Sequence, residues 1–154
     1  MKLPLSTIPI GVLLAEDDQD DRFFFKKAID ALTFQIQFKA VEDGQELMEY
    51  LLGNSAMLPN VLFLDYNMPR KNGFECLLAI KLNPKLQALP VIIYSTYVHE
   101  EIAELLYENG AHLYIRKTEF AELKNLLNTI LTQIAENKFV RPPREKFIFS
   151  FLKA

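Results

Sequence analysis

Acidic residues follow two apolar runs of the chain, at the points where each run ends. Asp65 closes the run 61–64, and Glu16, Asp17 and Asp18 close the run 10–15. An unbroken apolar run is typical of a buried parallel strand, and ligands of open α/β sheets bind at the carboxyl ends of such strands. Two strands that deliver carboxylates to one edge would form an oxygen-rich crevice. We therefore expect a site for a hard divalent cation such as Mg²⁺ beside Asp65.

Five strand-like apolar runs alternate with five helical patterns, and these elements would position the acids. We predict strands at residues 10–15, 35–40, 60–65, 90–95 and 112–115. We predict helices at residues 19–31, 44–52, 73–82, 99–109 and 119–135. Strands that alternate with helices form βαβ units, and right-handed crossovers place the helices on both faces of a parallel sheet. The pattern predicts an α/β domain with a doubly wound parallel sheet.

Polarity and capping residues refine this prediction. The second strand alternates polar and apolar residues, which favours an edge strand with one solvated face. Asp43 and Thr118 precede the second and fifth helices and are candidate N-caps.

Composition restricts the class of protein. The 154 residues are half hydrophobic, which favours one domain with one substantial core. The single cysteine, Cys76, lies in an apolar helical pattern, so we expect a buried thiol, no internal disulfide and a cytoplasmic location. We expect no membrane-spanning helix, because no apolar stretch approaches roughly 20 residues. We expect no secretory signal, because residues 1–10 contain two prolines and no long apolar core. The net charge of −3 gives no argument for binding nucleic acid or a membrane.

Residues 137–154 depart from the alternating pattern. Pro142-Pro143 precedes a segment in which Phe147, Phe149 and Phe151 recur at the period of a strand. Residues 137–154 as a whole hold five basic residues and one acidic residue, which is weak support for nucleic-acid binding without a recognition fold. In one interpretation this tail lies on its own domain or is disordered. In the other it adds to a sheet edge or docks on a second subunit to form a homodimer.

Polar residues also follow the fourth and fifth strands. Ser95 and Thr96 end the fourth strand, and Lys117 follows the fifth. Each has a plain explanation as a helix cap or a solvated loop residue, and Tyr114 has one as a half-exposed packing residue. Taken together, polar groups at the ends of four strands of one sheet indicate a single constellation.

This constellation resembles the receiver domain of two-component response regulators, the fold also used by the single-domain chemotaxis regulator. The resemblance covers about residues 9–136 and rests on the acid motif at 13–18, the phosphoacceptor motif at 61–69, and the strand motifs at 90–95 and 114–117. Gly73, Ser95 and Lys117 lie 8, 30 and 52 residues after Asp65, as expected in the family. The resemblance implies a five-stranded (βα)5 sheet of flavodoxin-like order 2-1-3-4-5. Residues 137–154 would be an extension, with no separate output domain.

The resemblance implies a phosphoacceptor rather than an enzyme, with only self-catalysed aspartyl phosphorylation and dephosphorylation. Asp65 would take a phosphoryl group from a sensor histidine kinase or a phosphotransfer protein. Lys117 and Ser95 would donate hydrogen bonds to the phosphoryl oxygens.

The same resemblance implies a Mg²⁺ site. The ion would be bound by Asp65, Asp17 and the backbone carbonyl of Asn67, with Glu16 holding a coordinated water. A shift of one residue would instead make Asp17 and Asp18 the acidic pair.

In the family, Ser95 moves toward the phosphoryl group and Tyr114 swings inward. This repacks the face of the fourth helix, fifth strand and fifth helix for a downstream protein. Two positions depart from the family pattern. Thr118 replaces the usual proline after Lys117, so we expect a trans peptide and a slightly displaced lysine. Thr96 replaces a small residue, so we expect narrower access to the phosphoryl group and slower loss of phosphate.

Two alternatives come from other classes of protein. A receiver-like scaffold would bind partners without phosphorylation, but the intact acids, Ser95 and Lys117 argue against it. A Mg²⁺-dependent phosphatase resembling haloacid dehalogenases would carry a second acid two residues after its nucleophile, where this chain has Asn67. Nucleotide binding has less support, because the five glycines form no phosphate-binding loop.

Overall fold

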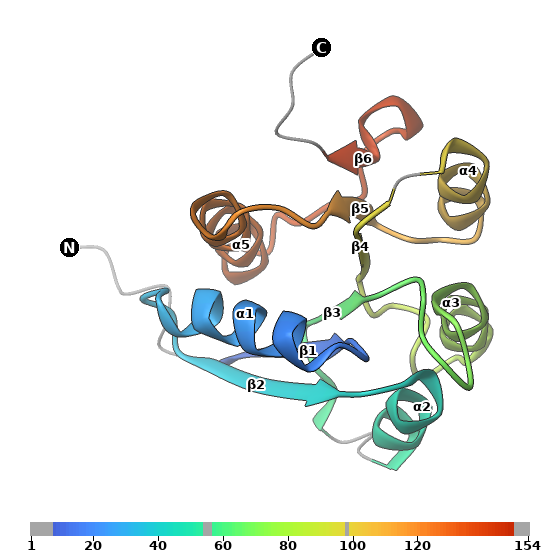
Figure 1. The fold of residues 1–154 in the computed structure, drawn as a ribbon, viewed down its shortest axis with the longest axis horizontal. Coiled ribbons are helices and arrows are strands. Elements are labelled where there is room, and N and C mark those ends of the chain that lie inside the picture. Colours follow the sequence, from blue (N-terminus) through green and yellow to red (C-terminus); the bar gives the residue numbers. More distant parts are fainter. Residues whose placement is uncertain (1–7, 54–56, 98, 150–154) are drawn as a thin grey trace.

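One parallel sheet forms the centre of the molecule. In the computed structural model, which describes residues 8–53, 57–97 and 99–149, the strand order is β2-β1-β3-β4-β5-β6 (Figure 1). The strands are β1 (Ile10–Ala15), β2 (Ile36–Val41), β3 (Val61–Leu64), β4 (Val91–Ser95), β5 (Leu113–Arg116) and β6 (Ile148–Phe149). The helices are α1 (Gln19–Asp30), α2 (Gly44–Gly53), α3 (Gly73–Leu82), α4 (Glu100–Glu108) and α5 (Phe120–Ala135), and the 3₁₀ helix η2 (Arg144–Lys146) precedes β6.

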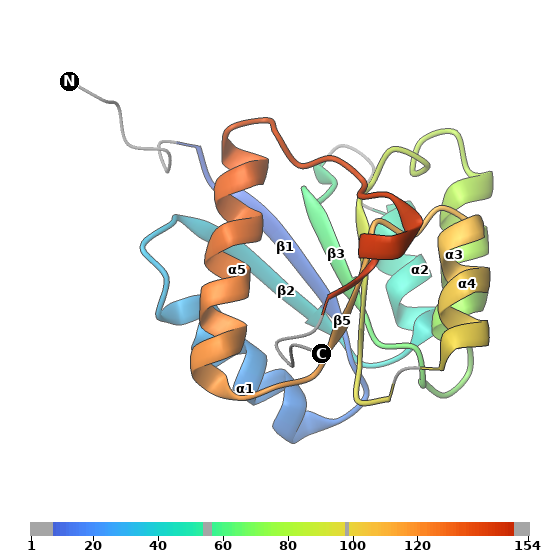
Figure 2. The same cartoon turned by 90° about the horizontal axis from the view of Figure 1, so that it is seen from above.

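Helices cover both faces of this sheet. Helices α1 and α5 lie on one face, and α2, α3 and α4 lie on the other (Figures 1 and 2). Each face has its own apolar core, because successive strand residues point to opposite sides: Leu62 packs with the α2–α3–α4 layer, and Phe63 packs with the α1–α5 layer. Strands β3 and β4 are buried along their whole length, as the two-sided cover requires.

The structure confirms the predicted doubly wound sheet of order 2-1-3-4-5. All ten predicted helices and strands are present, and their ends agree with the predictions to within one residue. Strand β2 is an edge strand whose residues alternate between exposed and half-buried, as its polarity predicted. Asp43 caps α2, since its carboxylate accepts a hydrogen bond from the Glu46 N–H at 2.8 Å.

The predicted cap of α5 by Thr118 is wrong. The N-cap position falls one residue later, at Glu119, whose side chain makes no capping hydrogen bond. The Thr118 hydroxyl instead donates to the carboxylate of Glu122, one helical turn further on. Thr118 therefore stabilises this turn through a side chain rather than through the helix backbone.

The sheet has one more strand than the five that were predicted. Residues 148–149 pair in parallel with β5, with Tyr114 opposite Ile148, so this part of the tail lies on its own domain and extends the sheet edge. Phe147, just before β6, is completely buried. Phe151 and Lys153, which belong to the same tail, lie outside the described residues.

Two expectations from composition are met within the described part of the chain. Cys76 is a buried free thiol on α3, and burial raises its pKa to about 11. None of the helices that the structure describes is long and apolar enough to cross a membrane.

Candidate functional site: an acidic pocket at the strand ends

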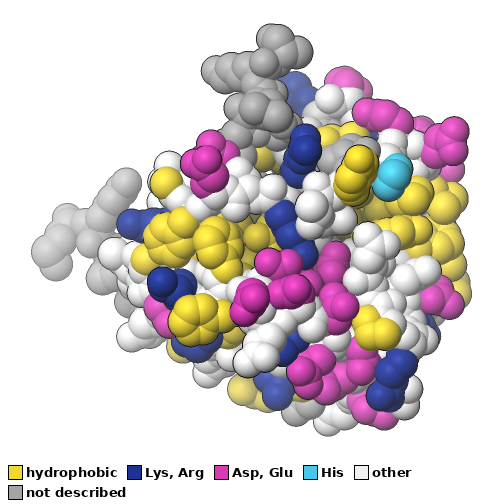
Figure 3. Space-filling view, in the orientation of Figure 1, with side chains coloured by type: hydrophobic (Ala, Val, Ile, Leu, Met, Phe, Trp, Pro, Cys, Tyr) yellow, Lys and Arg dark blue, Asp and Glu magenta, His cyan; other side chains and the backbone are white. Residues whose placement is uncertain are grey.

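The strand register brings the polar residues to one edge of the sheet. The N–H of Asp65 donates to the Ala15 carbonyl at 3.0 Å, which places the end of β3 beside the end of β1. The N–H of Lys117 donates to the Ser95 carbonyl at 2.8 Å, which does the same for β5 and β4. Acidic side chains gather near the centre of the face shown in Figure 3. The four strand ends therefore form one site, as their polar residues indicated.

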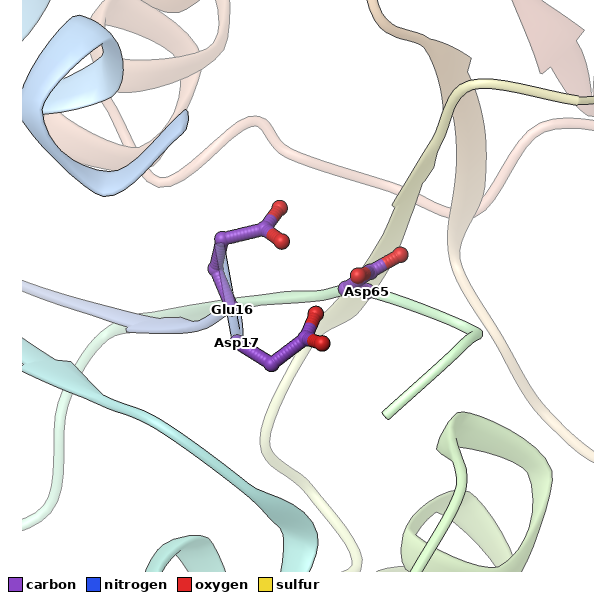
Figure 4. Close-up of side chains that lie close together, drawn as sticks. All are labelled: Glu16, Asp17 and Asp65. Atoms are coloured by element: carbon purple, nitrogen blue, oxygen red, sulfur yellow. The ribbon is translucent and has the colours of Figure 1, made fainter. Parts of the chain in front are cut away.

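Three carboxylates form the acidic pocket, which we define as Glu16, Asp17 and Asp65. One carboxylate oxygen from each lies within 4.8 Å of those of the other two, and the side chains converge in Figure 4. Glu16 and Asp65 are buried, whereas Asp17 is exposed at the rim. Asp18 has a different task, because its carboxylate accepts the N–H of Asp21 at 2.9 Å and caps α1. The geometry thus groups the Glu16-Asp17 pair with Asp65.

The loop after Asp65 folds tightly against α3. The N–H of Gly73 donates to the Tyr66 carbonyl at 2.8 Å. A Cβ atom at Gly73 would lie 2.8 Å from the backbone carbonyl oxygen of Asp65 and the Cα of Tyr66, closer than real contacts allow. A glycine is required here because backbone approaches backbone beside the pocket.

Lys117 places its ammonium group over this pocket. Its Nζ lies 2.6 Å from Glu16 Oε1, 2.8 Å from Asp21 Oδ2 and 4.0 Å from Asp65 Oδ2. Burial lowers the pKa of Lys117, but hydrogen bonds to Asp21 and Glu16 outweigh it and leave the pKa raised. The peptide bond between Lys117 and Thr118 is trans, as expected, since no peptide bond in the described ranges is cis.

The electrostatics of the pocket favour an added positive charge. Burial raises the pKa of Asp65 to about 8, the charge of Glu16 adds to this effect, and Lys117 opposes it. Burial also raises the pKa of Glu16, against contacts with Lys117. One lysine does not offset two buried carboxylates, and an oxygen-only donor set is what hard divalent cations bind. The residues present therefore fit a divalent metal.

Asn67 lies at the rim of the pocket. Its N–H donates to Asp65 Oδ1 at 3.4 Å, so the backbone after β3 already contacts the carboxylate. The predicted role of its carbonyl as a metal ligand stays a prediction.

Ser95 and Tyr114 lie beside the pocket on β4 and β5. Ser95 is buried and Thr96 is exposed. Tyr114 is only 1 % exposed, so the interpretation as a half-exposed packing residue is wrong. Its hydroxyl donates to the backbone carbonyl of Tyr97 at 2.5 Å. Burial raises the pKa of Tyr114, and a hydrogen bond from Ser95 opposes this rise.

Sequence reasoning missed Asp21 and Tyr94. Asp21 forms an ion pair with Lys117, and the same ammonium lies 5.5 Å from the centre of the Tyr94 ring. The signal for Asp21 was its place in the acidic first turn of α1, directly after the strand end that supplies Glu16 and Asp17. No pattern in the sequence indicated the ring of Tyr94, which lies in an apolar strand.

Comparisons with known proteins agree with this geometry. The family model of the response regulator receiver domain matches residues 12–130. The response regulator Rcp1 of Synechocystis is 30 % identical over 129 residues, which cover 81 % of this chain and 86 % of that protein.

Two solved structures share the fold. The crystal structure of the phosphorylated cyanobacterial phytochrome response regulator RcpA superposes with a TM-score of 0.77 at 28 % identity, covering 88 % of this chain and 100 % of that one. The crystal structure of the Mn²⁺-bound form of response regulator Rcp1 gives a TM-score of 0.74 at 27 % identity, with the same coverage. The family model spans most of this chain, and the acidic pocket lies at the carboxyl ends of its strands. The chain therefore belongs to the response regulator receiver domains, which are signalling phosphoacceptors rather than enzymes.

Proposed function

We propose that Asp65 is the phosphoacceptor of a stand-alone response regulator, which takes its phosphoryl group from a histidine kinase or a phosphotransfer protein. The observation that carries this proposal is the position of Asp65, which is 5 % exposed, beside two further carboxylates and 4.0 Å from the ammonium of Lys117. A carboxylate oxygen of Asp65 attacks the phosphorus of a phosphohistidine. The new O–P bond forms as the P–N bond breaks, and the electron pair stays on the imidazole.

The neighbouring residues of Asp65 have separate tasks in this reaction. Mg²⁺ held by Asp17, Asp65 and the Asn67 carbonyl, with Glu16 binding a coordinated water, would offset the charge on the phosphoryl oxygens. The ammonium of Lys117, within reach of Asp65, binds one phosphoryl oxygen of the product, and the hydroxyl of Ser95 binds another.

The response follows from Ser95 and Tyr114. When the Ser95 hydroxyl turns to the phosphoryl group, the backbone after it moves, and with it the Tyr97 carbonyl that holds the Tyr114 hydroxyl at 2.5 Å. Tyr114 then repacks the face of α4, β5 and α5, which a downstream protein reads. The opposing candidate is a scaffold that binds partners without phosphorylation.

Phosphorylation by acetyl phosphate tests this proposal directly. Purified protein with Mg²⁺ is expected to gain the mass of one phosphoryl group, measured by intact mass spectrometry. The adduct should be absent from Asp65→Asn and from a sample with chelator, and present in Asp30→Asn, a carboxylate-to-amide control on the exposed side of α1. A folded wild-type protein that gains no adduct would favour the scaffold.

A further inference from the structure

The tail of the chain covers the face that a receiver domain would use for output. We define the clamp as residues 139–149, which run along α4 and end in β6 beside β5 (Figures 1 and 2). Among the side chains of the clamp, those of Arg141, Arg144 and Phe147 make contacts with this face.

Arg141 binds the carboxyl end of α4. Its Nε donates to the Ala111 carbonyl at 2.8 Å, and its guanidinium also donates to the Tyr107 carbonyl. The guanidinium lies 3.6 Å from the centre of the Tyr107 ring, and the Tyr107 hydroxyl donates to the Pro142 carbonyl at 3.2 Å. A cation at this position is also favoured by the negative end of the α4 dipole.

Arg144 and Phe147 attach the clamp along the rest of α4. Arg144 forms ion pairs with Glu100, at 3.4 Å, and with Glu104. Phe147 is completely buried, and its ring centre lies 5.1 Å from that of Tyr107 and 6.2 Å from that of Tyr114. The clamp therefore combines basic residues with an aromatic anchor, and the face beneath it combines acids with aromatic rings.

Tyr114 connects this clamp to the acidic pocket. Its hydroxyl donates to the Tyr97 carbonyl at 2.5 Å, two residues after Ser95, while its ring contacts Phe147 and its N–H donates to the Phe147 carbonyl at 3.0 Å. A movement of Tyr114 toward the pocket therefore withdraws one wall of the site that holds Phe147.

We propose that the clamp is an internal competitor, which occupies the α4–β5 face in the unmodified chain and leaves it when Asp65 is phosphorylated. This inference rests on the proposed function. The phosphoryl group draws in Ser95 and the backbone after it, which carries the Tyr97 carbonyl bonded to the Tyr114 hydroxyl, so the Tyr114 ring shifts with them. Phe147 then packs less well in the phosphorylated chain than in the unmodified chain. This difference in contact energy between the two states favours release of the clamp.

Release of the clamp uncovers a surface of defined chemistry. Tyr107 and Tyr114 offer aromatic faces, Glu100 and Glu104 offer negative charge, and the turn after α4 offers the Ala111 carbonyl that Arg141 now binds. A partner that replaces the clamp must share its chemistry, so the fitting partner is an extended peptide with arginine residues followed by an aromatic anchor.

Hydrogen exchange of the Tyr114 amide measures clamp release, because this N–H is bonded to the Phe147 carbonyl. The protein is incubated with acetyl phosphate and Mg²⁺, and the phosphorylated fraction is measured by intact mass in the same sample. We expect hydrogen exchange at Tyr114 and within residues 139–149 to be about tenfold faster in the phosphorylated protein. This change corresponds to a typical coupling free energy between two sites.

Variants of the clamp test the coupling in the opposite direction, from the clamp to the phosphorylation site. Phe147→Ala should exchange rapidly without phosphorylation and should bind the phosphoryl mimic beryllium fluoride, with Mg²⁺, about tenfold more tightly, because coupling between two sites is reciprocal. Val140→Ala is the matched control, since Val140 lies in the same segment but is 76 % exposed. Arg144→Gln, which removes the ion pairs to α4 and the guanidinium beside the Phe147 ring, gives a second test if Phe147→Ala does not fold.

The outcomes separate the two proposals. A phosphorylated protein with unchanged or slower exchange overturns the clamp as a competitor and leaves Asp65 as the phosphoacceptor. A folded protein that gains no adduct overturns both. Faster exchange in Asp65→Asn treated in the same way would also overturn the clamp, because release would then not depend on Asp65.

Discussion

Asp65 lies in a pocket that disfavours its ionised form. Burial and the charge of Glu16 raise its pKa to about 8, whereas a carboxyl in the unfolded chain titrates near its model value of 3.8. The unfolded chain therefore releases this proton at a lower pH than the folded chain does. Without a divalent cation, the contribution of Asp65 to stability is most favourable at low pH and is lost as the pH rises from about 4 to about 8.

Replacement of Asp65 by asparagine should thus stabilise the metal-free protein. At pH 7 with chelator, we expect Asp65→Asn to raise the free energy of unfolding by about 1–3 kcal/mol, because folding at this pH forces Asp65 to take up a proton or to bury its charge, and a neutral amide avoids both costs. Urea denaturation measures the free energy of unfolding of both proteins. Added Mg²⁺ should reduce the difference between them by stabilising only the wild type. Asp30→Asn on the exposed side of α1 should show no such gain. A destabilised Asp65→Asn protein would contradict the assignment of burial as the main cause of the raised pKa of Asp65.

Thr96 is the residue expected to set the lifetime of the phosphoryl group. It is exposed and directly follows the buried Ser95 at the mouth of the pocket. We expect Thr96→Ala to speed the loss of phosphate by roughly fivefold, about 1 kcal/mol in the barrier, because water gains access. The decay of the phosphorylated mass after removal of acetyl phosphate measures this rate. An unchanged rate would remove Thr96 from the mechanism, and Thr129→Ala on α5 serves as the control.

At the scale of the elements, the turn between α4 and β5 packs against the start of the clamp. His112 stacks on Phe139 with ring centres 5.7 Å apart. Burial lowers the pKa of His112 to about 4, and the charges of Lys81 and Arg141 add to this effect. Folding therefore requires a neutral imidazole at the junction of helix, strand and clamp.

This junction predicts a loss of stability in mild acid. The stability that neutral His112 allows is fully present above its unfolded pKa of 6.5 and is lost as the pH falls toward 4, because the unfolded chain binds the proton first. Over this pH range, we expect the free energy of unfolding of the wild type to fall by about 1–3 kcal/mol more than that of His112→Phe. Urea denaturation at pH 7 and pH 4.5 measures the difference. His99→Phe, at the exposed second histidine, should keep the wild-type slope, and equal slopes in all three proteins would contradict the prediction.

At the scale of the whole molecule, the sheet continues into the tail. Strand β6 adds to the edge of β5, and Phe147 is buried under its own chain. The anchor that a second subunit would need is thus already used within one molecule.

The oligomeric state should therefore not depend on the tail before phosphorylation. We expect the full chain and a chain ending at residue 137 both to have the mass of a monomer by light scattering. A dimer that becomes a monomer on truncation would show that the tail reaches a second subunit, as the homodimer interpretation holds. Retention of the far-ultraviolet circular dichroism spectrum controls for folding of the shorter chain.

The sequence by itself determined the order of helices and strands and the residues at the ends of the strands. Apolar runs such as 61–64 and the acids that follow them are local patterns, and a parallel sheet brings such strand ends together whatever the details of packing. Only the tertiary structure decided that Asp21 contacts Lys117, that Tyr114 is buried and that Phe147 packs on it. These contacts join residues 17 to 96 positions apart or depend on what covers a strand edge. Sequence periodicity reports which face of an element is apolar, but not which distant segment packs against it, because that choice depends on three-dimensional complementarity.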